Sequence, residues 1–123
     1  MKINEKGTNL SITPEIRDYL YKKLEHLKKF IQGAEANALA EVELGKISNH
    51  HKNGDIFRAE INLHLAGENW RAVSEQSDLF AAIDIAKDEM VRELQSGKDK
   101  RVSLLRRGGA RVKGLLKSIF IRD

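Results

Sequence analysis

Two adjacent histidines and a lysine are the residues whose types come closest to a chemical site. His50, His51 and Lys52 stand directly before an Asn53-Gly54 pair, which favours a tight hairpin turn. Imidazole could bind a metal, but neighbouring residues of an extended chain point to opposite sides, and neither cysteine nor HExxH spacing completes a site. We predict no metal site and interpret the three side chains as a hairpin tip, either exposed to solvent or in contact with a partner's phosphate or base edge.

No pattern typical of catalysis stands out elsewhere. Gly45-Lys46-Ile47-Ser48 imitates the end of a phosphate-binding loop, but Ala40 occupies the place of that motif's first glycine. Acidic residues and serines are plentiful, yet no Gly-x-Ser-x-Gly turn or recognisable acid pair accompanies them. We therefore predict a protein that is not an enzyme and that has no cofactor and no small-molecule substrate.

Lysine and arginine are the residue types that could bind a polyanion, and they are unevenly distributed. Residues 98–123 hold nine basic and two acidic residues, a net charge of +7. The first 97 residues hold 13 basic and 16 acidic residues, a net charge of −3, so the whole excess lies in the tail. This asymmetry favours nucleic acid over an anionic membrane, although charge alone does not choose between them. The candidate contacts in the tail are Lys98, Lys100, Arg101, Arg106, Arg107, Arg111 and Lys113.

Apolar residues also recur within the tail, from Val112 to Phe120. An amphipathic helix could therefore lie on anionic lipid or fold onto a partner, whereas a basic end exposed to solvent is the simpler interpretation. Gly108, Gly109 and Gly114 weaken any helix formed there in isolation.

Length and composition set the class of protein. A chain of 123 residues is long enough for one domain with a hydrophobic core. The sequence has no cysteine, no apolar leader in MKINEKG and no apolar run of about 18 residues. These features predict a soluble protein of the cytoplasm without a membrane segment.

Hydrophobic periodicity predicts four strands and two helices. Apolar residues alternate with polar ones in the strands and recur every three or four residues in the helices. Thr13-Pro14 begins the first helix and Gly33 ends it, while Ser77 or Asp78 caps the second helix, which ends near Ser96-Gly97. The predicted strands span residues 1–7, 40–45, 57–65 and 69–76.

This order, βαβββα, predicts an α+β fold in which both helices cover one face of a four-stranded sheet as a two-layer sandwich. We expect residues 1–97 to form this domain and residues 98–123 to be a basic C-terminal tail. The other sheet face should be exposed to solvent, with Glu41, Glu43, Arg58, Glu60 and Asn62 on it.

Both predicted helices carry basic residues that could contact phosphates. An acidic residue stands four positions before several of them, a spacing that favours ion pairs within a helix. RNA contact and internal charge pairing therefore both remain open for these faces. The expected pairs are Asp18–Lys22, Glu25–Lys29 and Asp88–Arg92.

Three segments together resemble the ribosome hibernation-promoting factors and ribosome-associated translation inhibitors. They are GTNLSITPEIRDYLYKKLEHLKKF, NHHKNGDIFRAEINLHLAGENWRA and SDLFAAIDIAKDEMVRELQ, and the resemblance covers about residues 1–107. It implies a non-enzymatic protein with the same βαβββα fold. Such a protein binds the small ribosomal subunit in the mRNA and tRNA channel, occludes the A and P sites and inhibits translation during stress or starvation.

The resemblance also implies which residues meet ribosomal RNA. Ser96-Gly97 depart from the family by standing where basic residues are common, so binding through the helices is expected to be weaker and the tail to compensate. The matching basic positions are Lys23, Lys29, Arg92 and Lys100, with Lys22, Lys28 and Lys87 as neighbours.

Long members of the family have a separate dimerisation domain, whereas this chain resembles the short form and is expected to be a monomer. Two rival interpretations remain open at this point. One is a general double-stranded RNA-binding module, and the other is an adaptor at a membrane surface that acts through the basic tail.

Overall fold

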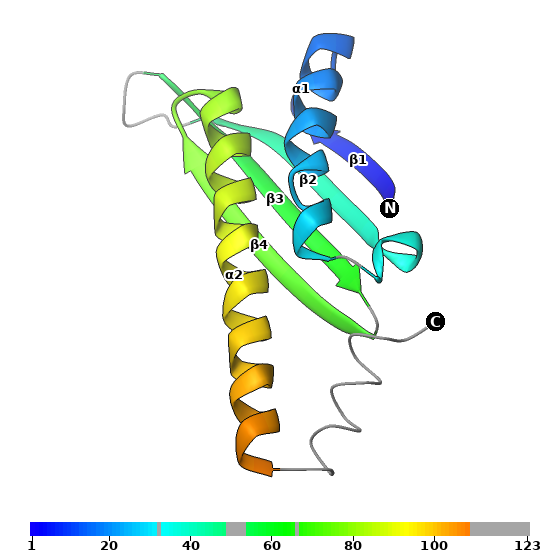
Figure 1. Cartoon of the computed structure of the whole chain (residues 1–123). Coiled ribbons are helices and arrows are strands. Elements are labelled where there is room, and N and C mark those ends of the chain that lie inside the picture. The colour runs from blue at the N-terminus through cyan, green and yellow to red at the C-terminus, as the bar shows by residue number, and fades with distance from the viewer. Residues whose placement is uncertain (32, 49–53, 66, 109–123) are drawn as a thin grey trace.

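The computed structural model describes residues 1–31, 33–48, 54–65 and 67–108, and among residues 98–108 it describes the backbone alone. The order of elements is βαβββα with two short 3₁₀ turns, η1 and η2, between the first helix and the second strand (Figure 1). The elements are β1 (Lys2–Thr8), α1 (Pro14–Glu25), η1 (Lys28–Phe30), η2 (Glu35–Asn37), β2 (Leu39–Ser48), β3 (Asp55–Leu65), β4 (Glu68–Gln76) and α2 (Leu79–Gly108).

The four strands form one mixed sheet in the order β1-β2-β3-β4. β1 runs parallel to β2, and the other two pairings are antiparallel. Val42 of β2 lies opposite Ile61 of β3, and Ile61 lies opposite Ala72 of β4, so the apolar residues of three strands share one face. Both helices cover that face (Figure 1), which confirms the predicted two-layer α+β sandwich.

The first helix begins as expected but ends early. The Thr13 hydroxyl oxygen accepts a hydrogen bond from the Ile16 amide at 3.2 Å, and Pro14 occupies the first turn. The expectation that one helix continues to Gly33 is wrong, because α1 ends at Glu25 and the chain tightens into η1. Leu27 and Ile31, on either side of this turn, are still buried in the core.

The second helix is capped by Asp78, whose carboxylate accepts a hydrogen bond from the Ala81 amide at 3.1 Å. An apolar stripe that runs along α2 from Leu79 to Leu94 is buried against the sheet. The expected end near Ser96-Gly97 is wrong, because α2 continues to Gly108 and passes beyond the sheet (Figure 1). Serine and glycine each lower helix stability by about 1 kcal/mol or less, which the helix-forming residues on either side can offset. The boundary predicted between residues 97 and 98 therefore falls inside a helix.

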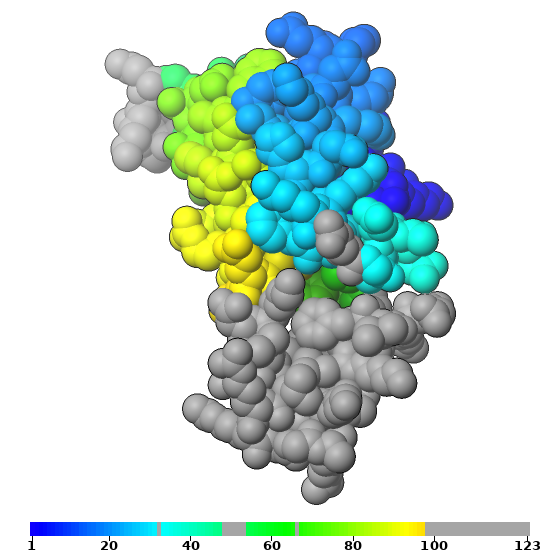
Figure 2. Space-filling model, in the orientation of Figure 1, coloured from blue at the N-terminus to red at the C-terminus, as the bar shows by residue number. Residues whose placement is uncertain are grey.

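The core lies between the helices and the sheet. Its largest fully buried side chains include Leu20 and Leu24 of α1, Leu63 of β3, and Ile83 and Met90 of α2. The space-filling view shows α1 and α2 side by side over the sheet (Figure 2). Three aromatic side chains, Phe30, Phe57 and Trp70, are half-buried at the margin of the core.

Replacing Ile83 by alanine should lower the free energy of unfolding by about 2–5 kcal/mol, because the deletion leaves a cavity under α2. Ile85 lies on the same helix but is 38% exposed, so the same substitution there should cost about 0.5 kcal/mol or less. Urea unfolding of both variants measures the difference. Equal losses would contradict the burial of one face of α2.

Candidate nucleic-acid interface

The basic residues of the helix layer gather at the carboxyl end of α1 and in η1. Residues 14–31 hold five basic and three acidic residues, whereas residues 79–97 of α2 hold two basic and four acidic ones. The lysines also stand where the dipole of α1 is negative, which favours cations. The α1 lysine patch consists of Lys22, Lys23, Lys28 and Lys29.

Lys23 is held between the two helices. Its Nζ lies 3.2 Å from Oδ1 of Asp84 on α2 and 5.2 Å from the ring centroid of Tyr19. The Tyr19 hydroxyl donates to the same carboxylate, at 2.7 and 2.8 Å from its two oxygens. Hydrogen bonding to Asp84 raises the pKa of both Lys23 and Tyr19, so the ammonium stays charged and the phenol stays neutral at physiological pH.

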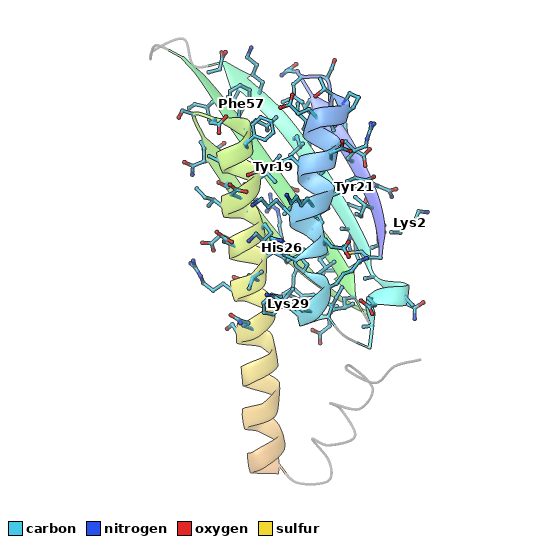
Figure 3. The ribbon with its side chains drawn as sticks, turned by 45° about the horizontal axis from the view of Figure 1, so that its top comes forward. Lys2, Tyr19, Tyr21, His26, Lys29 and Phe57 are labelled. Carbon is cyan, nitrogen blue, oxygen red and sulfur yellow. The ribbon has the colours of Figure 1, made fainter. Side chains whose placement is uncertain are left out.

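The other lysines of the patch are less constrained. Lys28 pairs with Glu25 at 3.1 Å, and the Nζ of Lys29 lies 5.3 Å from the ring centroid of Phe30. Figure 3 shows Lys29 and His26 near the carboxyl end of α1, and Tyr21 on its opposite side, toward β1. Within the described ranges, Lys22 and Lys29 have no acidic partner, so two ammonium groups of this surface remain available to an external anion.

The expected ion pairs four residues apart are wrong. Glu25 contacts Lys28 rather than Lys29, because α1 ends at Glu25 and Lys29 no longer lies one α-helical turn away. Arg92 contacts Glu89 at 2.9 Å, and Asp88 contacts Lys87 at 2.7 Å. Asp18 and Lys22 do not pair either, which is physically reasonable because exposed ion pairs contribute little.

The two basic residues in the first part of α2, residues 79–97, are less available to an external anion than the sequence suggested. Lys87 is only 16% exposed and Arg92 is 73% exposed, and each lies against an acidic neighbour on its own helix. The structure therefore brings the predicted contacts of α1 together as one positive surface. Residues 79–97 of α2 hold more acidic than basic residues.

Several predicted contacts lie outside the described side chains. His50, His51 and Lys52 are among them, and so are Arg111 and Lys113. Lys98, Lys100, Arg101, Arg106 and Arg107 belong to α2 by their backbone alone. Within the part of the chain that is described, no group of three His, Cys, Asp or Glu residues could hold a metal ion. Among the same residues, no helix is long and apolar enough to cross a bilayer.

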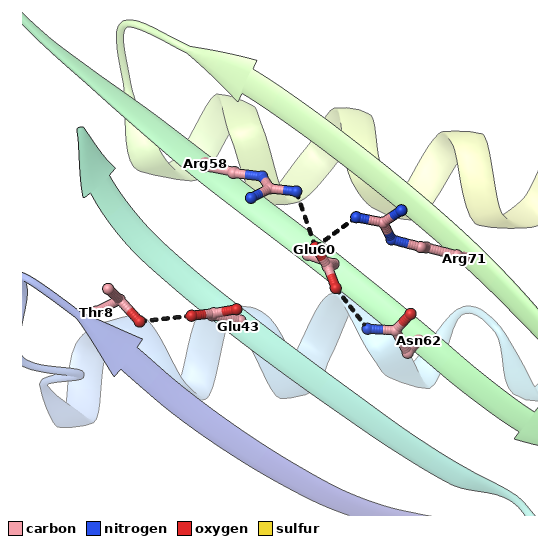
Figure 4. A network of polar contacts seen from close by, with 6 residues as sticks. All are labelled: Thr8, Glu43, Arg58, Glu60, Asn62 and Arg71. Carbon is pink, nitrogen blue, oxygen red and sulfur yellow. Dashed lines mark hydrogen bonds and ion pairs between the residues drawn. The ribbon is translucent and has the colours of Figure 1, made fainter. Parts of the chain in front are cut away.

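The outer face of the sheet is polar, as predicted, but its charges satisfy one another. Glu60 accepts hydrogen bonds from Asn62 at 2.8 Å, from Arg71 at 3.0 Å and from Arg58 at 2.9 Å (Figure 4). The bonds from Asn62 and Arg71, with the two guanidinium charges, hold the pKa of Glu60 below its usual value. Glu60 contacts both arginines, and Glu41 and Glu43 lie on the same face, so this face attracts a polyanion less than the α1 lysine patch does.

A histidine joins three strands on the same outer face. Nε2 of His64 lies 2.6 Å from Oε1 of Glu41 on β2, and Nδ1 contacts the Asn69 side-chain oxygen on β4. Both partners accept hydrogen bonds, so both ring nitrogens donate when the imidazole is protonated. Hydrogen bonds to Asn69 and then to Glu41 raise the pKa of His64 above its usual value.

The match to a known family is extensive. Residues 3–102 match the family described as Sigma 54 modulation protein / S30EA ribosomal protein. The chain belongs to this family. Members of the Sigma 54 modulation protein / S30EA family are binding proteins, which confirms that this chain is not an enzyme.

Relatives within the Sigma 54 modulation protein / S30EA family have consistent names. A ribosome hibernation promoting factor of Pseudomonas putida is 30% identical over 111 residues, which cover 90% of this chain and 100% of that protein. A ribosome hibernation promotion factor of a Picosynechococcus species is 31% identical over 100 residues, which cover 81% of this chain but only 50% of that protein. The solved N-terminal domain of Thermus thermophilus Protein Y is 37% identical, with a TM-score of 0.66, and the match covers 78% of this chain and 98% of that one.

Sequence patterns missed the residues that organise these surfaces. Asp84 meets Tyr19 across 65 positions of the chain, and Arg71 reaches Glu60 from the neighbouring strand. No short-range spacing of residues in the sequence predicts either contact. A β-strand register that places Asn62 opposite Arg71 is the one signal that could have indicated the cluster around Glu60.

Titration of His64 by NMR should give a pKa above the usual 6.5, and replacing Glu41 by glutamine should lower it. Because folding raises this pKa, the stabilisation by His64 is fully present below pH 6.5 and is lost as pH rises through the folded value. Replacing Glu75, which lies on the same face near Arg58, by glutamine is the control and should change the His64 pKa less. An unchanged titration in the Glu41 variant would contradict the contact.

Proposed function

We propose that this protein is a ribosome hibernation factor of the cytoplasm. It binds the small ribosomal subunit in the mRNA and tRNA channel, occludes the A and P sites and inhibits translation during stress or starvation. The observation that carries the proposal is the family match over residues 3–102, together with a relative named for ribosome hibernation that the chain matches over that relative's whole length.

The α1 lysine patch supports ribosomal RNA as the binding partner. Lys22 and Lys29, which have no acidic partner in the described part of the chain, can neutralise phosphates, and Lys23 offers a fixed ammonium group between the helices. Contacts to phosphates position a protein on nucleic acid without reading its sequence. Lys28, Lys87 and Arg92 belong to the same proposed surface, although each already lies against a carboxylate.

The tail supplies most of the long-range attraction in this proposal. Residues 1–97 have a net charge of −3, whereas residues 98–123 bring +7. α2 contacts η1 before it continues past the sheet, so the basic segment that starts at Lys98 leaves the domain on the helix that borders the α1 lysine patch. The folded domain then provides placement in the channel, and the hairpin tip with His50, His51 and Lys52 provides a further contact.

Purified protein should inhibit translation in proportion to the fraction of small subunits occupied, because the proposed mechanism is exclusion of mRNA and tRNA. Sucrose-gradient sedimentation gives the occupancy, and a translation assay on the same samples gives the inhibition. Inhibition at far below one copy per ribosome would contradict the mechanism. Sedimentation with membranes or with any RNA duplex, but not with small subunits, would favour the rival adaptor or the general RNA-binding module.

Replacing Lys22 and Lys29 by glutamine should weaken small-subunit binding and flatten the dependence of log affinity on log salt. Each phosphate contact contributes roughly 0.7–0.9 to that slope in simple nucleic acids. The matched control replaces Lys2 and Lys6, exposed lysines of β1, and changes the net charge by the same amount. Replacing Arg106, Arg107, Arg111 and Lys113 should flatten the slope further, by a few units.

Small-subunit binding is measured over a salt series, with translation assayed in parallel, for the α1, β1 and tail variants. Equal effects of the α1 and β1 substitutions would show that total charge matters and that the α1 lysine patch is no specific surface. Wild-type affinity in the tail variant would assign the interaction to the folded domain alone.

A further inference from the structure

An acidic residue lies within the proposed RNA-binding surface, and the function proposed above gives it no role. Asp84 projects from α2 toward α1, where its carboxylate meets the ammonium of Lys23 and the hydroxyl of Tyr19. A negative charge at this point opposes the approach of every phosphate. Its side chain is 39% exposed, so part of that charge is open to solvent and to a bound polyanion.

The same carboxylate restricts where Lys23 can be. The ammonium lies 3.2 Å from Asp84 and 5.2 Å from the centre of the Tyr19 ring, and the lysine side chain is 24% exposed. The Tyr19 hydroxyl donates to both carboxylate oxygens, and the Tyr19 ring packs edge-on against Phe80 at 4.8 Å. Asp84 therefore holds Lys23 and is itself held in place by the Tyr19 hydroxyl. Lys22 and Lys29 have no acidic partner among the described residues.

We propose that Asp84 is a specificity-determining residue of the RNA-binding surface, because it fixes Lys23 for a phosphate at one position and disfavours RNA in general. The proposal rests on the function proposed above. It concerns the ratio of two affinities, one for the small ribosomal subunit and one for an unrelated RNA.

Two physical effects of Asp84 act in opposite directions. Its charge weakens the attraction of every polyanion to this part of the surface. Its hold on Lys23 removes the cost of ordering a long side chain on binding, which is roughly a two- to tenfold factor in affinity. Only RNA with a phosphate at the fixed position benefits from the second effect. A generic duplex can bind in many arrangements, so it experiences mainly the first.

The test uses the full chain with Asp84→Asn. Asparagine keeps an oxygen that can accept a hydrogen bond from Tyr19 while the charge that holds Lys23 is removed. Affinities are measured at one salt concentration for isolated small ribosomal subunits and for an RNA duplex of unrelated sequence. We expect tighter binding of the duplex, and a ratio of small-subunit to duplex affinity that falls roughly two- to tenfold.

Asp18→Asn is the matched control. Asp18 is exposed on α1, and the described residues provide no partner for it, so its loss changes the net charge equally without releasing Lys23. Both affinities should then change in parallel and leave the ratio as it was. In a Lys23→Gln background, Asp84→Asn should no longer change the ratio, which a purely structural role of Asp84 would not predict.

If Asp84→Asn changed both affinities in parallel, the proposal would be overturned. Asp84 would then act only through its negative charge. Thermal unfolding shows whether that variant is folded. If it is not, Lys23→Gln with Asp84 intact provides the test, since it must also lower the ratio, and an unchanged ratio would overturn the proposal. A wild-type protein that binds small subunits no more tightly than the duplex would instead refute the function on which the proposal rests.

Discussion

Burial of a single apolar sheet face under two helices is the interaction on which the rest of the structure depends. Leu20 and Leu24 of α1 and Ile83 and Met90 of α2 are fully buried against that face. Removing apolar surface from water contributes roughly 25 cal/mol per Å² and is in general the dominant favourable term in folding. Because each helix has only one apolar stripe, the arrangement directs the remaining polar residues either to the outer side of the helices or to the far side of the sheet.

These two polar surfaces have different chemistry although both contain charges of each sign. On the sheet, Glu60 is surrounded by its own donors, Arg58, Arg71 and Asn62, so its charge is compensated within the protein. On the helix layer, Lys22 and Lys29 lack a carboxylate partner among the described residues, and Lys23 is fixed by Asp84. Charges that are already paired within the protein attract a highly charged partner weakly. Cations without an acidic neighbour can neutralise the phosphates of such a partner, which favours binding. The α1 lysine patch is therefore a candidate interface and the outer sheet face is not, because the two surfaces differ in how their charges are paired more than in the number of charges.

The sequence predicted the features that depend on local periodicity and capping. Alternation gave the strands, Thr13 and Asp78 began the helices, and the apolar stripes identified the buried faces. It failed at the two helix ends, where α1 tightens into a 3₁₀ turn after Glu25 and α2 continues through Gly97, because small differences in propensity are decided by packing. It also missed the ion pair of Lys23, because its partner Asp84 comes from the other helix and the contact depends on how the core places the two helices.

The continuation of α2 has a mechanical consequence. A 30-residue helix is about 45 Å long, and its last 11 residues extend about 16 Å. If the helix ended at residue 97, the residues that follow could leave the domain in any direction. Because α2 continues, residues 98–108 follow the helix axis, whose direction is fixed by the packing of α2 on the core. The helix therefore sets the direction in which the basic residues from Lys98 to Arg107 extend from the domain. The placement of α2 on the sheet thus decides on which side of the domain this positive charge is presented.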